Sequence, residues 1–167
     1  MINIVLFQPE IPQNTGNIMR TCVGINAKLH LVKPFGFSLE ESAVKRSAAN
    51  YLQDLNYVVY DSVEDFFSMN TGTYYFLTRY ATQSYSDIKY NSNEEIYLIF
   101  GSESKGIAKE LLAANYDKCY RIPTTEKIRS LNLSNAVAIV AYEVMRQLDF
   151  PDLLLFDKQK GEDYLKT

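Results

Sequence analysis

The chain has 167 residues, of which 47% are hydrophobic and 22% charged, as expected for one globular domain with an ample core. A net charge of −3 excludes indiscriminate coating of nucleic acid, which depends on many phosphate contacts, but leaves room for a local basic patch. No signal peptide and no apolar run long enough to cross a membrane is found, which predicts a cytoplasmic protein.

Cysteine and histidine offer little material for metal binding or nucleophilic catalysis. Cys22 and Cys119 lie far apart beside apolar residues, so we interpret both as reduced core thiols. His30, the single histidine, lies in the apolar run LHLV and is expected inside a strand. No HExxH, GxSxG or Cys/His cluster is present, so neither a hydrolase nor a metalloenzyme is expected.

Strand patterns alternate with helix patterns along the chain. We expect strands at residues 2–7, 28–32, 57–60, 74–78, 96–100 and 119–122. We expect helices at residues 16–23 (capped by Asn14 or Thr15), 39–49 (with Glu41 in its first turn), 63–69 (capped by Ser62), 107–114 and 135–148. This alternation predicts an α/β fold, with a mostly parallel sheet and helices on both faces. One domain over residues 1–151 and a polar tail over 152–167 are expected.

The last predicted helix follows a polar stretch and opens with an unbroken apolar run. Ser134 or Asn135 is the natural N-cap, because its side-chain oxygen can accept from a free helix N–H. The six residues 136–141 leave no polar face over two turns, which predicts burial on all sides.

Three polar loops follow predicted strand ends, where parallel sheets place their active sites. The first loop contains Asn14 and is followed by Arg20. Asn14 could equally be only a helix cap, and Arg20 only a solvated side chain. The second, LIFGSESKG at 98–106, is either a tight turn or a place where a ligand approaches the backbone, with Glu103 binding a polar group or favouring the next helix. The third is Ser130-Leu131-Asn132. Their shared placement favours one composite site.

These loops carry a resemblance to a known family. NTGNIMRTC (14–22), IFGSESKGI (99–107) and IPTTEKIRSLNLSNAVAIVAYE (122–143) resemble the three motifs of SPOUT-class RNA methyltransferases that methylate ribose 2′-hydroxyls. The opening NIVLFQPEIPQNTGNI and the compact length are most similar to the branch that acts on the wobble nucleotide, position 34, in the tRNA anticodon loop, a cytidine or modified uridine. Relatives often carry an added N-terminal RNA-binding domain, which is not expected here because the first strand begins at Ile2.

The resemblance implies a C-terminal trefoil knot, S-adenosylmethionine as the cofactor, and a homodimer with the first and last helices at its interface. It implies that the cofactor is held by Leu77, Thr78, Gly101, Gly106, Ile122, Ser130 and Leu131. It implies that catalysis uses Arg20, Asn14, Glu103, Ser130 and Asn132. It implies tRNA contacts from Arg20 and Tyr142. Five further basic residues lie near the motif loops or the second helix and are candidate phosphate contacts: Lys45, Arg46, Lys105, Lys127 and Arg129.

Several alternatives stay open. Arg20 could act as a base, with the proton relayed by a bound phosphate, or remain charged and stabilise a developing alkoxide. The basic residues could be a solvated surface, and Tyr142 could serve helix packing. The protein could instead methylate another tRNA or rRNA site, or be a catalytically silent RNA-binding protein of the same fold.

Overall fold

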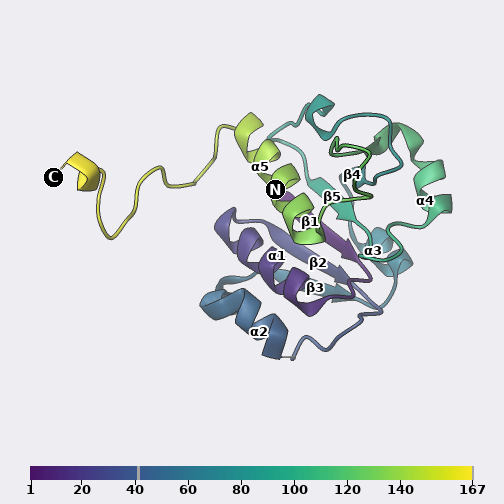
Figure 1. The fold of residues 1–167 in the computed structure, drawn as a ribbon, viewed down its shortest axis with the longest axis horizontal. Helices are drawn as coiled ribbons and strands as arrows, with labels where there is room; N and C mark the ends of the chain where they lie inside the picture. Colours follow the sequence, from purple (N-terminus) through teal and green to yellow (C-terminus); the bar gives the residue numbers. More distant parts are fainter. Residues whose placement is uncertain (41, 167) are drawn as a thin grey trace.

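The structure, a computed structural model, describes residues 1–40 and 42–166. Its centre is a six-stranded, fully parallel sheet in the order β3-β2-β1-β5-β4-β6 (Figure 1). The strands are β1 (Ile2–Phe7), β2 (Lys28–Val32), β3 (Tyr57–Tyr60), β4 (Thr73–Leu77), β5 (Ile96–Phe100) and β6 (Cys119–Tyr120). The main helices are α1 (Pro12–Gly24), α2 (Ser42–Ala48), α3 (Val63–Met69), α4 (Lys109–Ala114) and α5 (Leu133–Gln147).

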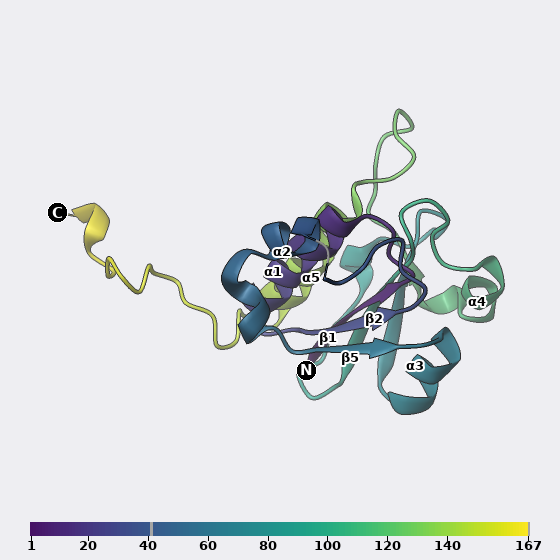
Figure 2. The same ribbon diagram turned by 90° about the horizontal axis from the view of Figure 1, so that it is seen from below.

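Helices cover both faces of the sheet, as predicted. α1, α2 and α5 lie on one face, and α3 and α4 lie on the other (Figure 2). Each face of the sheet packs against its helices in a separate hydrophobic core. In β1, Ile4 and Leu6 point into the core beneath α1, α2 and α5, while Val5 and Phe7 point into the core beneath α3 and α4. A strand buried on both faces is apolar throughout rather than alternating, which is the pattern that the sequence showed.

The strand order places the site. β1 and β5 are neighbours at the centre of the sheet, although 88 residues separate the end of β1 from the start of β5. From β1 the chain continues to β2, on the side of β1 that faces away from β5. From β5 it continues to β6, which lies at the opposite edge of the sheet. In an open parallel sheet, ligands bind outside the carboxyl ends of strands where the direction of winding changes. The loops after β1 and β5 meet at such a point.

Two predicted helix starts were wrong. α1 begins at Pro12 rather than near residue 16, with Ile11 in the N-cap position, so Asn14 and Thr15 are buried helix residues instead of caps. α5 begins at Leu133 because Asn132, not Ser134 or Asn135, is the cap and accepts from the amides of both those residues.

Other boundaries moved by a few residues. The helix predicted over 39–49 is shorter, with a 3₁₀ turn at Ala49–Asp54 after it, and Glu41 lies outside the described residues. α4 starts two residues later than predicted, β4 runs one residue earlier, and β6 stops at Tyr120. The Ser62 cap of α3 is confirmed, since its hydroxyl accepts from the Asp65 amide.

The prediction that residues 136–141 are buried on all sides was wrong for the single chain. Val137, Val140 and Ala141 are buried in the core, but Ile139 is 38% exposed. The adjacent Tyr142 is 48% exposed. α5 therefore presents a short apolar stripe, made of Ile139 and Tyr142, outward between the exposed polar residues Asn135 and Arg146.

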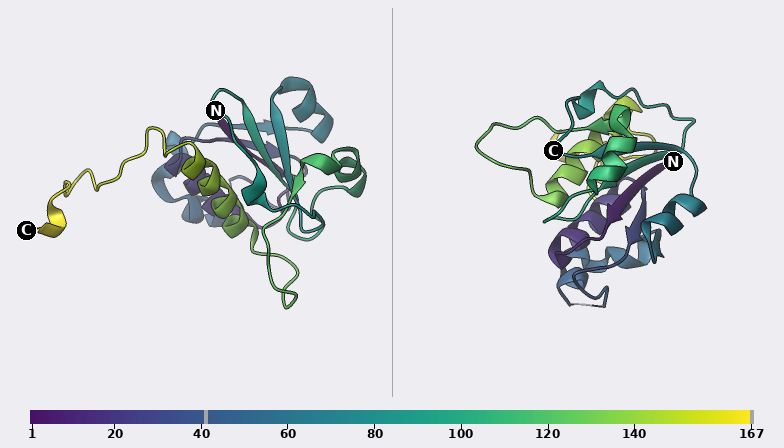
Figure 3. Two further views of the ribbon diagram at one scale, coloured as in Figure 1. Left: turned by 90° about the horizontal axis from the view of Figure 1, so that it is seen from above. Right: turned by 90° about the vertical axis from the view of Figure 1, so that its right-hand side faces the viewer.

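Cys22 and Cys119 are buried free thiols, as predicted, and burial raises the pKa of Cys22 to about 12. His30 is a buried strand residue, also as predicted. Beyond α5 the chain runs away from the body, and Leu155 in this segment is 89% exposed (Figures 1 and 3). Within the described residues no helix has the length and apolar character needed to cross a membrane.

Candidate active site

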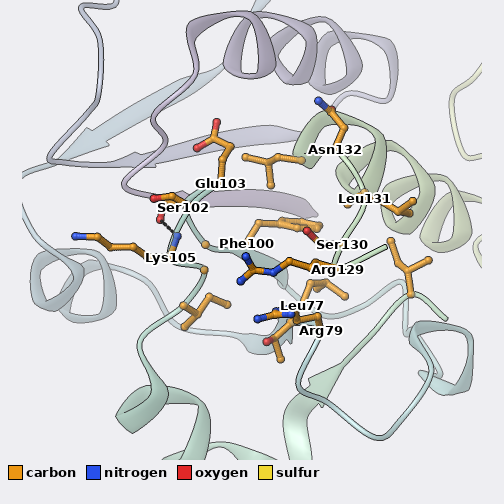
Figure 4. A pocket seen from close by; sticks show the side chains of 18 of the residues that line it. Leu77, Arg79, Phe100, Ser102, Glu103, Lys105, Arg129, Ser130, Leu131 and Asn132 are labelled. Atoms are coloured by element: carbon orange, nitrogen blue, oxygen red, sulfur yellow. Dashed lines mark hydrogen bonds between the residues drawn. The ribbon is translucent and has the colours of Figure 1, made fainter. Parts of the chain in front are cut away.

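A cavity of about 600 Å³ lies at the carboxyl ends of β4 and β5 (Figure 4). This volume falls within the range of small-molecule sites. Its walls come from the loops after β4 and β5 and from the segment between β6 and α5. All seven predicted cofactor residues line it: Leu77, Thr78, Gly101, Gly106, Ile122, Ser130 and Leu131. The sequence motifs therefore converge on one cavity.

The inner wall of the cavity is apolar. Leu77 and Phe100 are the last residues of β4 and β5, and Ile107, Ile122 and Leu131 add further hydrocarbon surface. Sequence reasoning missed Phe100 and Ile107, although both stand directly beside the glycines of the second motif. Such a wall can bury a flat heteroaromatic ring, while backbone amides and carbonyls at the strand ends read its polar edge.

The glycine-bounded loop is both a tight turn and part of the cavity. A Cβ on Gly101 would lie 2.1 Å from the Gly106 carbonyl carbon, so no side chain fits there. Gly106 has a φ of +66°, which favours glycine, and its amide donates to the Ser102 carbonyl at 2.9 Å. The two glycines close the loop on itself, and this closure sets its position at the cavity wall.

Glu103 binds the loop after β1 rather than favouring the following helix. Its carboxylate accepts from the backbone amides of Glu10 (2.8 Å) and Ile11 (3.0 Å). It also accepts from Asn14 Nδ2 at 3.3 Å. Ile11 is the N-cap residue of α1 and Glu10 precedes it, so the carboxylate satisfies a free N–H group at the start of the helix and lies near the positive end of the helix dipole. Glu103 thus caps α1 from 92 residues away.

A reciprocal contact fastens the same two loops. The Ser104 hydroxyl donates to Glu10 Oε1 at 2.6 Å, and this hydrogen bond lowers the pKa of Glu10. Each loop therefore offers a carboxylate to the other, and the pair holds the first and second motifs in a fixed relation.

The third motif is connected to the other two through Asn132. Its Nδ2 donates to Asn14 Oδ1 at 3.0 Å, while its Oδ1 accepts from the Ser134 amide and hydroxyl at 2.9 and 2.6 Å. One chain of hydrogen bonds therefore runs from Glu103 through Asn14 and Asn132 to the N-terminus of α5. Four of the five predicted catalytic residues line the cavity: Asn14, Glu103, Ser130 and Asn132.

Arg20, the fifth, does not line this cavity. It is exposed on α1, and its guanidinium carbon lies 5.1 Å from the centre of the Tyr51 ring. The expectation that one chain gathers Arg20 with the other four is therefore not met, and its catalytic role stays a prediction.

The predicted RNA contacts divide in the same way. Lys105 and Arg129 line the cavity. Lys45 and Arg46 lie on α2, where Lys45 pairs with Glu40 at 3.3 Å, and Tyr142 lies on the outer stripe of α5. Lys127 is exposed in the segment between β6 and α5, which projects from the body as a long loop (Figure 2).

The structure adds two arginines that sequence reasoning missed. Arg79 and Arg121 line the cavity beside Arg129. Each lies just past the end of a strand, β4 or β6, and this position was the available signal. Among the described residues, no group of three or more potential metal ligands occurs.

Residues 1–142 match the SpoU rRNA Methylase family, and the chain belongs to it. A putative tRNA (cytidine(34)-2′-O)-methyltransferase of Listeria innocua is 47% identical over 154 residues, covering 91% of each chain.

Solved structures agree with this assignment. One, concerned with "the 2-OH methylation of C/U34 on tRNA", aligns with a TM-score of 0.84 and 36% identity, covering 89% of this chain and 97% of the other. An AdoMet-bound rRNA methyltransferase from Sinorhizobium meliloti aligns with a TM-score of 0.79 and 25% identity, covering 88% of this chain and 56% of the other.

Proposed function

We propose that this chain transfers a methyl group from S-adenosylmethionine to the ribose 2′-hydroxyl of the wobble nucleotide, position 34, in tRNA. The observation that carries the proposal is the cavity at the carboxyl edge of the sheet, where the bonded residues Glu103, Asn14 and Asn132 join three motif loops. The relative from Listeria innocua and the structure concerned with C/U34 support the choice of RNA and nucleotide.

The cavity suits the proposed cofactor. The apolar wall around Leu77, Phe100 and Ile122 would hold the adenine, and the polar rim at Ser130 and Asn132 would lie toward the sugar and amino acid portions. S-adenosylmethionine, when bound, supplies a methyl group on a positively charged sulfur, which an oxygen nucleophile can attack directly. Its binding to the Sinorhizobium meliloti relative supports this assignment.

The residues of the cavity are better placed to orient a hydroxyl than to take its proton. Glu103 accepts from three donors, which uses most of the four lone-pair positions of a carboxylate. Asn132 is bonded at both its amide nitrogen and its oxygen. Rigid orientation of the oxygen, with a positive charge held near the developing negative alkoxide, would then provide the acceleration. As the O–C bond forms and the S–C bond breaks, the hydroxyl proton passes to solvent water.

The proposal includes a homodimer. Arg20 and the exposed Ile139 and Tyr142 lie on α1 and α5, which pack side by side on one face of the sheet (Figures 1 and 2). A second copy seated on this face would cover the apolar stripe of α5 and could bring its own Arg20 to the cavity. The trefoil knot, a domain ending at residue 151 and a cytoplasmic location also belong to this proposal.

Labelled methyl transfer to anticodon stem-loops tests the function. We expect transfer to an RNA with a ribose at position 34 and none to the same RNA with 2′-deoxyribose there, because only the hydroxyl differs. Equal labelling of both RNAs would exclude ribose 34 as the target. No labelling of either, with S-adenosylmethionine bound, would favour a silent RNA-binding protein.

A further inference from the structure

A second cavity, of about 470 Å³, opens beside the first. The two share five lining residues, namely Arg79, Tyr80, Arg121, Thr124 and Arg129. They are therefore two parts of one groove, which runs from the proposed methyl-donor site out along the loop between β6 and α5. We call this second part the arginine groove.

The arginine groove concentrates positive charge on a negatively charged chain. Three arginines line it against one glutamate, Glu126. Among residues 1–40 and 42–166, no carboxylate lies within ion-pair distance of Arg79, Arg121 or Arg129. Several other described cations, Lys109 and Lys127 among them, also lack such a partner, so what distinguishes the groove is that three guanidinium groups line one cavity. Guanidinium groups gathered without a paired carboxylate indicate an anionic ligand that the chain itself does not supply.

The groove also offers an aromatic surface. The Tyr80 side chain is 65% exposed, and Arg79 lies 4.6 Å from the centre of its ring and donates to its hydroxyl at 2.7 Å. Arginines beside an accessible ring are the combination that binds single-stranded nucleic acid, where phosphates meet the cations and bases stack on the ring. Figure 4 shows Arg79 and Arg129 reaching into the cavity from different segments.

We infer that the arginine groove binds the single-stranded RNA next to the methylated nucleotide, with phosphates on Arg79, Arg121 and Arg129 and a base on Tyr80. The inference rests on the proposed function, because it assumes an RNA substrate whose target ribose lies at the first cavity. An alternative source of negative charge is the carboxylate of S-adenosylmethionine itself, and the test must separate the two.

The test measures two affinities on each variant. Arg79→Gln, Arg121→Gln and Arg129→Gln are compared with Lys109→Gln, an exposed α4 cation that lines neither cavity. We expect each arginine variant to weaken binding of an anticodon stem-loop about tenfold and to lower the slope of log Kd against log salt by about 0.7. Because the three arginines also line the first cavity, affinity for S-adenosylmethionine should fall, but much less than affinity for RNA, and Lys109→Gln should match the wild type.

The outcomes separate this inference from the proposed function. Wild-type affinity and salt slope for RNA in Arg79→Gln and Arg129→Gln, both exposed positions, would overturn the groove assignment while leaving methyl transfer intact. Weakened S-adenosylmethionine binding with unchanged RNA binding would assign the arginines to the cofactor and also overturn it. A wild-type protein that neither binds nor methylates the stem-loop would instead reject the proposed function.

Discussion

Asn132 donates a hydrogen bond of 3.0 Å to Asn14, which lies 118 residues earlier in the chain. The same side chain caps α5 through its oxygen, while Asn14 donates to Glu103. The start of α5 is thereby tied to the first turn of α1 and to the loop after β5. A shift of one loop must disturb the others, so the site behaves as one unit.

The variant Asn132→Asp separates the two roles of Asn132, which caps α5 and donates a hydrogen bond to Asn14. Aspartate retains an oxygen that caps α5 but cannot donate to Asn14. We expect thermal stability close to the wild type, whereas Asn132→Ala should lose about 1 kcal/mol with the cap. Both variants should lose methyl transfer at least about tenfold, because without the bond to Asn14 the loops shift and misplace the reacting groups. Normal transfer by Asn132→Asp, measured beside its melting curve, would show that the Asn14 bond is dispensable.

Glu103→Gln weakens the cap of α1. A glutamine amide has one oxygen and places an N–H group among three donors, so at least one of the amides of Glu10 and Ile11 loses its acceptor. We expect a loss of about 2 kcal/mol in the free energy of unfolding in urea. Glu162→Gln removes the same charge from an exposed position in the C-terminal tail and should leave the unfolding curve unchanged. Similar curves for both variants would argue against the cap.

Local sequence rules found the strands and motif loops but misplaced the two helix starts that matter most. Asn14 looked like a cap because caps are normally supplied by residues just before a helix. The α1 N-terminus is instead satisfied by Glu103, which reaches it only through the pairing of β1 with β5. The role of Glu103 could not be predicted from its sequence neighbours, because it too depends on the pairing of β1 with β5.

The cofactor cavity could be predicted from the sequence, whereas the arginine groove could not. Glycines, polar residues and strand ends in a motif are local features, so all seven proposed cofactor residues lie together as expected. Arg79 and Arg121 belong to no motif and become neighbours only because β4 pairs with β6. Arg20 shows the converse, since it belongs to a local motif and yet does not line the cavity of its own chain.

Gly101→Ala tests the closed loop. The added Cβ would meet the Gly106–Ile107 backbone at 2.1–2.5 Å, so the loop must open and displace the cavity wall. We expect methyl transfer to fall about a hundredfold, the scale of a 1 Å misplacement. Gly24→Ala is the matched control, because no atom lies within 4 Å of its added Cβ. Calorimetric titration with S-adenosylmethionine would show whether the loss lies in binding, and unchanged binding and transfer would contradict the closed geometry.

His30 predicts a pH dependence of stability. Its Nε2 bonds Asn3 Oδ1 at 2.9 Å and its Nδ1 bonds the Tyr60 hydroxyl at 2.8 Å, an arrangement that suits the neutral ring. Burial lowers its pKa from 6.5 to about 4. The unfolded chain therefore binds the proton first as pH falls, and stability declines from about pH 6.5 toward pH 4.

Between pH 7 and pH 5 this decline should reach about 2 kcal/mol in urea unfolding. His30→Gln should flatten the dependence within this window. Because the chain has one histidine, its ring proton resonances also report the folded pKa directly. A folded value near 6.5 would remove the predicted slope, whatever the stability of the variant.

Subunit mixing tests whether Arg20 acts on the cavity of a partner. Arg20→Ala alone should bind S-adenosylmethionine nearly normally, because Arg20 does not line the cavity of its own chain, and should transfer almost no methyl. Gly101→Ala alone should lose methyl transfer about a hundredfold. If the chain forms the proposed homodimer, co-expression of the two variants gives mixed dimers in which one intact cavity faces one intact Arg20. Random pairing then restores about a quarter of the wild-type activity, measured as labelled methyl transfer. If Arg20 served its own chain, the mixture would be as inactive as either variant, since no subunit would hold both parts.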